Sequence, residues 1–189
     1  ISKRLYTALL YGIRSDTVHF ERDASLEDIG AYYLTFSRAN RELIRRIELN
    51  QIPDRFLKYF DYAYHRKRRH RDRVICFLDA VESADVCVQV ADFYLRLINI
   101  FYVVIAGIVK DRMIIVFRGD GYRQDCGAIA LKAFGNIGSA GGHRSAARVE
   151  IPIETIKSTL ENDLSPEAVE RFLVQRLRRK KKAETKAEV

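Results

Sequence analysis

The stretch 101-FYVVIAGIVKDRMIIVF-117 consists of two apolar runs separated by three polar residues. Both runs are much shorter than the roughly 18 to 20 apolar residues of a membrane span. Both are rich in the β-branched and aromatic residues that are typical of strands. The polar link at 110–112 is short enough for a tight connection. The stretch therefore predicts a β-hairpin with strands at 101–109 and 113–117.

The sequence on both sides of this hairpin alternates between strand and helix patterns. A compact apolar run at 73–80 predicts a strand, and residues 84–97 have the spacing of an amphipathic helix. Three further elements are expected: a helix at 125–134 that begins at an N-cap, a short strand at 149–151, and a helix that starts at Ser165, Pro166 and Glu167.

The N-terminal third of the chain has only helical patterns. The expected helices are 2–12, ending at Gly12, one that starts at a capping box of Ser25 and Asp28, 41–50, and one opened by Pro53. The period changes near 68–73. We therefore predict a mixed α/β chain, with a helical segment at 1–68 and a smaller mixed-sheet domain with flanking helices at 69–189.

Composition indicates a globular protein with an anionic partner. Hydrophobic residues make up 48% of the chain, and the formal net charge is +8. No apolar run is long enough for a membrane span, so we expect a cytoplasmic protein. Cys76, Cys87 and Cys126 lack metal-site spacing and are expected to be reduced packing residues. The chain begins at Ile1 without an initiator methionine, so a fragment of a longer protein is expected.

Two basic clusters, 65–73 and 178–182, supply much of the positive charge. They are candidates for contact with nucleic-acid phosphates, and Tyr62 and Tyr64 precede the first cluster as possible stacking residues. The alternatives are a solvated helix face for the first cluster, a frayed tail for the second, and core packing for the tyrosines. The candidate nucleic-acid-binding residues are Arg66, Lys67, Arg68, Arg69 and Arg71.

The stretch 134-FGNIGSAGGHRSAAR-148 contains four glycines followed at once by His143. Glycine lets a ligand approach the backbone, and consecutive free N–H groups form anion-binding concavities. If 144–147 opens a helical turn, its amides would add to that field. The pattern suits phosphate or nucleotide binding; the alternative is a flexible loop with an exposed histidine.

Gly141, Gly142 and His143, with two alanines three residues after the histidine, resemble the GGGHxxAAG signature of the DHH-associated C-terminal domain. This domain follows the Asp-His-His catalytic domain in DHH-family phosphoesterases such as RecJ-type exonucleases and oligoribonuclease/pAp phosphatases. Residues 88–109, 114–121 and 124–135 resemble the elements that precede the signature. The resemblance implies that substrate phosphate or nucleotide is bound by Arg118, Gly141, Gly142 and His143.

The resemblance is not complete, and its site residues have simpler interpretations as well. Ala140 stands in place of the signature's first glycine, and Arg148 in place of its last. The alternative role for Arg118 is a surface ion pair with Asp120.

Residues 8-ALLYGIRSDT-17 resemble the last motif of the Asp-His-His catalytic domain, which would make Asp16 a metal ligand and Mn²⁺ the cofactor of the full-length protein. The alternative is a helix-terminal aspartate bonded to nearby backbone. The family's other metal ligands, including the Asp-His-His triplet, are not found in this sequence.

The resemblance implies a fragment of a metal-dependent phosphoesterase that acts on nucleotides or short oligonucleotides and is inactive alone, with a dimer possible. Two other interpretations stay open: a non-catalytic nucleic-acid-binding module and a nucleotide-sensing regulatory domain. The same associated domain occurs in alanyl-tRNA synthetase, so the glycine signature does not by itself require hydrolysis.

Overall fold

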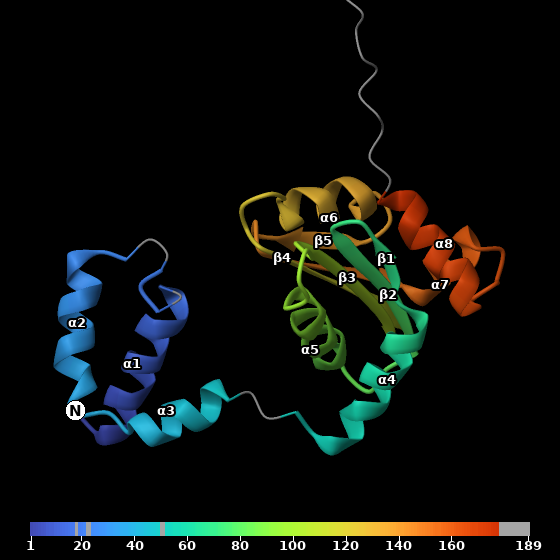
Figure 1. Ribbon diagram of the computed structural model, residues 1–189. Coiled ribbons are helices and arrows are strands. Elements are labelled where there is room, and N and C mark those ends of the chain that lie inside the picture. The colour runs from blue at the N-terminus through green and yellow to red at the C-terminus, as the bar shows by residue number, and fades with distance from the viewer. Residues whose placement is uncertain (18, 22–23, 50–51, 178–189) are drawn as a thin grey trace, which may run out of the picture. The chain divides into compact units, whose positions relative to one another are not determined.

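The computed structural model describes residues 1–17, 19–21, 24–49 and 52–177. The chain divides into two compact units, Ile1–Pro53 and Asp54–Val189 (Figure 1). The predicted boundary between residues 68 and 69 follows the change from helical to strand pattern. The units divide earlier because α4 (Leu57–Arg66) packs on the sheet of the second unit.

The first unit consists of α1 (Lys3–Asp16), α2 (Leu26–Phe36) and α3 (Arg41–Glu48). The capping box of Ser25 and Asp28 is present as predicted. The prediction that the first helix ends at Gly12 is wrong. The helix continues to Asp16, since one interior glycine costs only about 1 kcal/mol, and the Thr17 hydroxyl donates to the Ile13 carbonyl at the end of the helix.

The second unit is built on a six-stranded sheet of order β1-β2-β3-β4-β6-β5. The strands are β1 (Arg68–His70), β2 (Arg73–Ala80), β3 (Tyr102–Val109), β4 (Arg112–Gly119), β5 (Ser139–Gly142) and β6 (Ala146–Pro152). β2 and β3 are parallel, and every other neighbouring pair is antiparallel. β1 and β5 are therefore the two edge strands.

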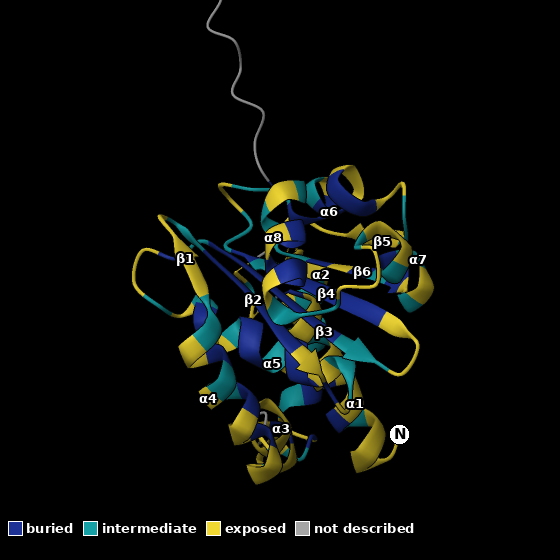
Figure 2. Ribbon diagram, turned by 90° about the vertical axis from the view of Figure 1, so that its right-hand side faces the viewer, coloured by how far each residue is buried: buried dark blue, intermediate teal, exposed yellow. Residues whose placement is uncertain are grey.

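Helices cover both faces of this sheet (Figure 1). One face packs against the short 3₁₀ helix Asp54–Phe56, α4 and α5 (Ala84–Leu95). The other packs against α6 (Cys126–Phe134), α7 (Ile153–Thr159) and α8 (Pro166–Arg176). Figure 2 shows the central strands as the most buried part of the unit. The predicted mixed α/β class with flanking helices is confirmed.

Local signals predicted several elements well. The β3–β4 hairpin is confirmed, as are the helix starts at Asp125 and Ser165. The helical turn suggested at 144–147 is wrong: β6 begins at Ala146, because Ala147, Val149 and Ile151 alternate into the core. The sequence pattern did not indicate β1, β5 or α7. None of the described helices is long and apolar enough to cross a membrane.

Candidate substrate-binding site

The glycine stretch forms edge strand β5 and the turn that leads into β6. Gly142 has φ +151°, and a Cβ there would collide with the carbonyl oxygen of Ala146 and the Cα of Ala147. Glycine is therefore required at this position by the fold itself. At Gly141, in contrast, a Cβ would meet no atom within 4 Å, so this part of the strand faces open space.

The carbonyl groups of the turn after Gly142 point toward the start of α6 and the end of β4. Three of them accept backbone hydrogen bonds: His143 from Gly127 at 3.0 Å, Arg144 from Cys126 at 3.0 Å, and Ser145 from Gly119 at 2.8 Å. The approach is close, since a Cβ at Gly127 would lie 2.6 Å from the Gly142 oxygen. The first amides of α6 therefore hold the turn and do not face a ligand.

The N–H groups of the turn are in a different position. The N–H of His143 donates to Ala146 at 2.7 Å. In an antiparallel ladder this pairing turns the N–H of the preceding Gly142 away from β6. The N–H groups of Arg144 and Ser145 have no acceptor among the described residues. Such neighbouring free donors are what an anion-binding turn requires.

The side chain of His143 is exposed and makes no hydrogen bond within the described chain. The Arg144 side chain is fixed: its guanidinium donates to the carbonyls of Gly121 at 3.0 Å and Tyr122 at 3.1 Å. This brace joins the turn to the loop after β4. No local pattern in the sequence marked Arg144 for this role.

Arg118, near the end of β4, forms a salt bridge with Asp92 of α5, at 2.8 Å from Nε to Oδ1. Its Nη1 donates to the Phe117 carbonyl at 3.2 Å. The alternative prediction, a surface ion pair between Arg118 and Asp120, is wrong. The Asp120 carboxylate instead accepts hydrogen bonds from the N–H groups of the following loop and lies 3.8 Å from Arg123. Arg118 is thus held with Nη2 free of described partners.

The strand register brings Arg118 and His143 to the same end of the sheet. Arg118 pairs with Ala146 on one side, and His143 bonds to Ala146 on the other. With strands about 4.8 Å apart, their Cα atoms are separated by roughly 10 Å. Gly141 shares the face of Arg118, since the alternate residue Ala140 packs into the opposite core. The four predicted substrate-binding residues therefore gather around one sheet corner.

The two departures from the family signature have structural roles. Ala140 packs against the core formed with α6. Arg148 pairs with Gly141 in the strand register, and its guanidinium forms a salt bridge with Glu150 at 2.7 Å. Arg148 thus lies beside the open part of β5 with its charge already engaged.

The first basic cluster lies at the opposite edge of the sheet, at the end of α4, in β1 and in the following turn. Two of its cations pair with carboxylates of α8. Arg66 meets Glu167 at 2.6 Å, and Arg68 meets Glu170 at 3.0 Å. The hydrogen bond from Arg66 lowers the pKa of Glu167. The sequence did not indicate that these two glutamates pair with the cluster, because they lie 101 and 102 residues away along the chain.

The remaining members of the cluster are less constrained. Lys67 donates to the Tyr64 carbonyl at 2.6 Å and stacks over its ring, and Arg69 donates to the Ile98 carbonyl at 3.2 Å. Arg71, in the turn after β1 with φ +56°, is exposed and forms no salt bridge with a described residue. Tyr62 packs against the core beside α5. The second basic cluster, 178–182, lies outside the described residues.

Asp16 is the last residue of α1, in the first unit. No group of three or more His, Cys, Asp or Glu side chains in the described chain has a metal-binding arrangement. The three cysteines are buried, as expected of packing residues. Burial raises the thiol pKa of Cys76 and of Cys87 to about 12, and that of Cys126 to about 11.

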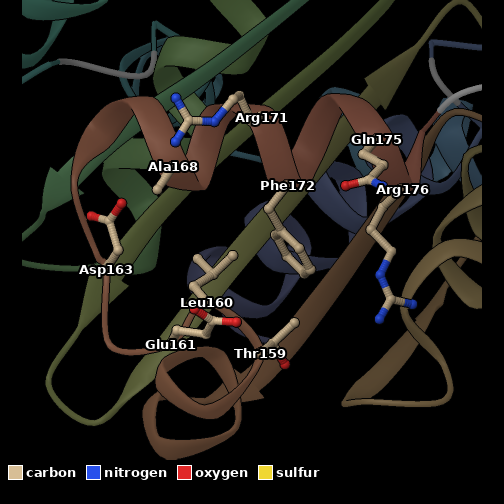
Figure 3. Close-up of a pocket in the computed structure, with 9 residues that line it drawn as sticks. All are labelled: Thr159, Leu160, Glu161, Asp163, Ala168, Arg171, Phe172, Gln175 and Arg176. Atoms are coloured by element: carbon tan, nitrogen blue, oxygen red, sulfur yellow. The ribbon is translucent and has the colours of Figure 1, made fainter.

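Three pockets lie around α8 in the second unit. One, of about 550 Å³, is bordered by the α7–α8 connection and by one side of α8, including Phe172 and Arg176 (Figure 3). The other two, each of about 730 Å³, share Arg73 and Gln175. None of the three includes Arg118 or the glycine turn, but Arg68 and Arg69 border one of them.

No protein-family model matches the chain. An uncharacterised protein of Methanocaldococcus jannaschii is 30% identical over 170 residues, which are 89% of this chain and 35% of that protein. An exopolyphosphatase-related protein from Bacteroides fragilis has a TM-score of 0.68 at 19% identity, over 94% of this chain and 50% of that one. RecJ from Thermus thermophilus has a TM-score of 0.42 at 13% identity, over 92% of this chain and 25% of that one.

The chain thus spans about a third of the archaeal relative and half of the exopolyphosphatase-related protein. The match to the latter covers nearly the whole chain and shows that the two proteins share a fold.

Proposed function

We propose that this chain is the substrate-binding part of a metal-dependent phosphoesterase of the DHH type, acting on nucleotides or short oligonucleotides. The observation that carries the proposal is the turn after β5, where the free N–H groups of Arg144 and Ser145 adjoin the exposed His143. The signature resemblance and the fold shared with an exopolyphosphatase-related protein support it.

The corner has the chemistry that a phosphate group requires. Backbone N–H groups, an imidazole and a guanidinium all donate hydrogen bonds to phosphate oxygens. Asp92 binds Nε of Arg118 and so fixes the direction of the guanidinium, which leaves Nη2 to the ligand. Because the backbone donors are held by the sheet and by α6, and Arg118 by Asp92 of α5, these groups lose little order when a phosphate binds. In this proposal His143 holds the substrate.

Mn²⁺ belongs to the proposal as the cofactor of the complete enzyme, where metal ions supply an activated water. Asp16 would contribute one ligand. The described residues do not provide the others, so the chain alone is not proposed to hydrolyse its ligand. A cytoplasmic location and dimer formation stay predictions.

The experiment is calorimetric titration of the 189-residue chain with adenosine 3′,5′-bisphosphate (pAp) at fixed ionic strength. We expect His143→Ala to weaken binding roughly tenfold, as the loss of one hydrogen bond to a charged group of about 1.5 kcal/mol implies. His65→Ala is the control, because His65 is also an exposed histidine but lies on α4 and borders none of the three pockets. It should leave the affinity unchanged.

Equal losses in the two variants would contradict the proposal, as would the absence of pAp binding to the unmodified chain. Circular dichroism of each variant establishes that its fold is intact, so that a lost affinity reports on the site.

A further inference from the structure

The two larger pockets beside α8 adjoin each other, since both are bordered by Arg73 and Gln175. We call this pair of pockets the α8 groove. One pocket lies between α8 and the β1–β2 edge. The other lies between the C-terminal end of α8, the start of α6 and the loop before it. α6 and α8 lie on the same face of the sheet (Figure 1). This α8 groove is on the face opposite to that on which Arg118 meets α5.

The α8 groove is lined by cations without carboxylate partners. Its acids are already engaged: Glu167 and Glu170 meet arginines, and Asp125 caps α6. Apart from Arg68, which meets Glu170, the lining arginines that make hydrogen bonds use neutral oxygens, as Arg73 does with the Leu177 carbonyl at 3.3 Å. The lining cations with no carboxylate oxygen within 4 Å in the described chain are Arg69, Arg73, Lys132, Arg171 and Arg176. Such a concentration of positive charge attracts a polyanion.

Apolar side chains also line the groove. Ile75 and Val174 border one half of the groove, and Ala128 and Ile129 the other. An inorganic polyphosphate has no apolar part to place on such surfaces. A nucleic-acid strand has both apolar rings and negative charges: its bases can bury their rings on apolar side chains while its phosphates meet the cations.

The α8 groove also reaches the loop that braces the candidate phosphate site. Arg123 and Gln124 border its end, and they follow directly on Gly121 and Tyr122, whose carbonyls bind Arg144.

We propose that the α8 groove binds the body of a single-stranded oligonucleotide. The assignment of the strand's terminal phosphate to the glycine turn rests on the proposed function above; binding in the groove does not. The substrate class is then an oligonucleotide of several residues, with a mononucleotide occupying the turn alone.

The test is fluorescence anisotropy of the full 189-residue chain with a labelled single-stranded octauridylate, measured over a series of salt concentrations. Lys132→Ala with Arg171→Ala removes one exposed cation from each half of the groove, and neither side chain makes a salt bridge. The control, Arg45→Ala with Arg46→Ala, removes the same charge from exposed positions on α3 of the first unit.

We expect the groove variant to bind the octamer at least tenfold more weakly and the control to change affinity less than twofold. The slope of log affinity against log salt should become shallower by about 0.7 for each phosphate of the single strand that no longer meets a cation. Affinity for pAp should be unchanged in the groove variant. Equal losses in both variants, no loss in either, or equal competition by polyphosphate of matched charge would overturn the proposal.

The His143→Ala variant separates the two proposals. If it leaves binding of both ligands intact while the groove variant loses the octamer, the proposed phosphate site fails and the groove stands. If His143→Ala weakens binding of both pAp and the octamer while the groove variant binds the octamer normally, the groove proposal fails and the phosphate site stands.

Discussion

At one edge of the sheet, Arg68 of β1 meets a carboxylate of α8. At the other edge, β5 carries glycines and leads into a turn with free N–H groups. Arg68 is paired with a glutamate that is only 3% exposed. Gly141 has no neighbour where a side chain would begin. The charged edge thus owes its conformation to ion pairs, and the glycine edge to backbone contacts.

A cluster of positive charge in the sequence therefore indicates a binding surface less directly than hydrogen-bond donors that have no acceptor in the folded protein. The members of the basic cluster that form salt bridges are already neutralised within the protein, whereas the backbone N–H groups of Arg144 and Ser145 have no internal acceptor among the described residues. The same distinction selects those cations of the α8 groove that lack carboxylate partners in the described part of the chain.

The strongest test of this comparison is Gly142→Ala. The new methyl group would meet the backbone of Ala146 and Ala147, and φ of +151° is unfavourable for alanine. Overpacking and backbone strain together should lower the free energy of unfolding by about 4 kcal/mol. Urea denaturation followed by circular dichroism measures the change. An unaltered midpoint would show that backbone contacts do not determine the glycine edge.

The corresponding change at the charged edge is Glu170→Ala. Removing this buried carboxylate leaves Arg68 without its partner, but Arg68 is exposed enough for water to compensate in part. We expect a loss of about 2 kcal/mol, below that of a fully buried pair. Glu154→Ala, which removes an exposed salt bridge to Lys157, should change the same urea midpoint very little. Similar effects of the two changes would mean that α8 does not secure β1.

Two helix caps allow the edges to be weakened one at a time. Asp125 caps α6, which holds the glycine turn, and Ser165 caps α8, which carries the glutamates to β1. Asp125→Ala and Ser165→Ala should each cost about 1 kcal/mol in thermal or urea unfolding. Only Asp125→Ala should also weaken pAp binding, because its helix donates to the carbonyls of the turn. A loss of pAp affinity in Ser165→Ala would contradict this separation.

The parts of the fold that the sequence predicted depend on residues close together in the chain. The hairpin connection and the caps at Asp125 and Ser165 are set by neighbours within three or four residues. β1 and β5 have only three and four residues and no apolar alternation, so they exist because β2 and β6 offer pairing partners. Short-range signals cannot reveal such strands.

The candidate site residues come from the family resemblance and stay a prediction, and the sequence did not indicate their contacts. The family signature indicated His143 and Arg118, yet the partner of Arg118 is Asp92, 26 residues away, and not the nearby Asp120. The brace by Arg144 crosses 22 and 23 residues to the loop after β4. These contacts depend on how α5 and the turn pack against β4, which no local pattern specifies.

The smallest expected effect on stability belongs to Gly141→Ala, and it tests the open side of β5. A methyl group at this position meets nothing within 4 Å, and φ is not in the left-handed region, so the free energy of unfolding should change by less than about 0.5 kcal/mol. If phosphate approaches the backbone here, the same methyl group should nevertheless weaken pAp binding severalfold. Calorimetric titration of the variant with pAp measures this effect. Unchanged stability together with unchanged affinity for pAp would place the ligand away from Gly141. The proposed site requires the phosphate to approach the face that the methyl group would occupy.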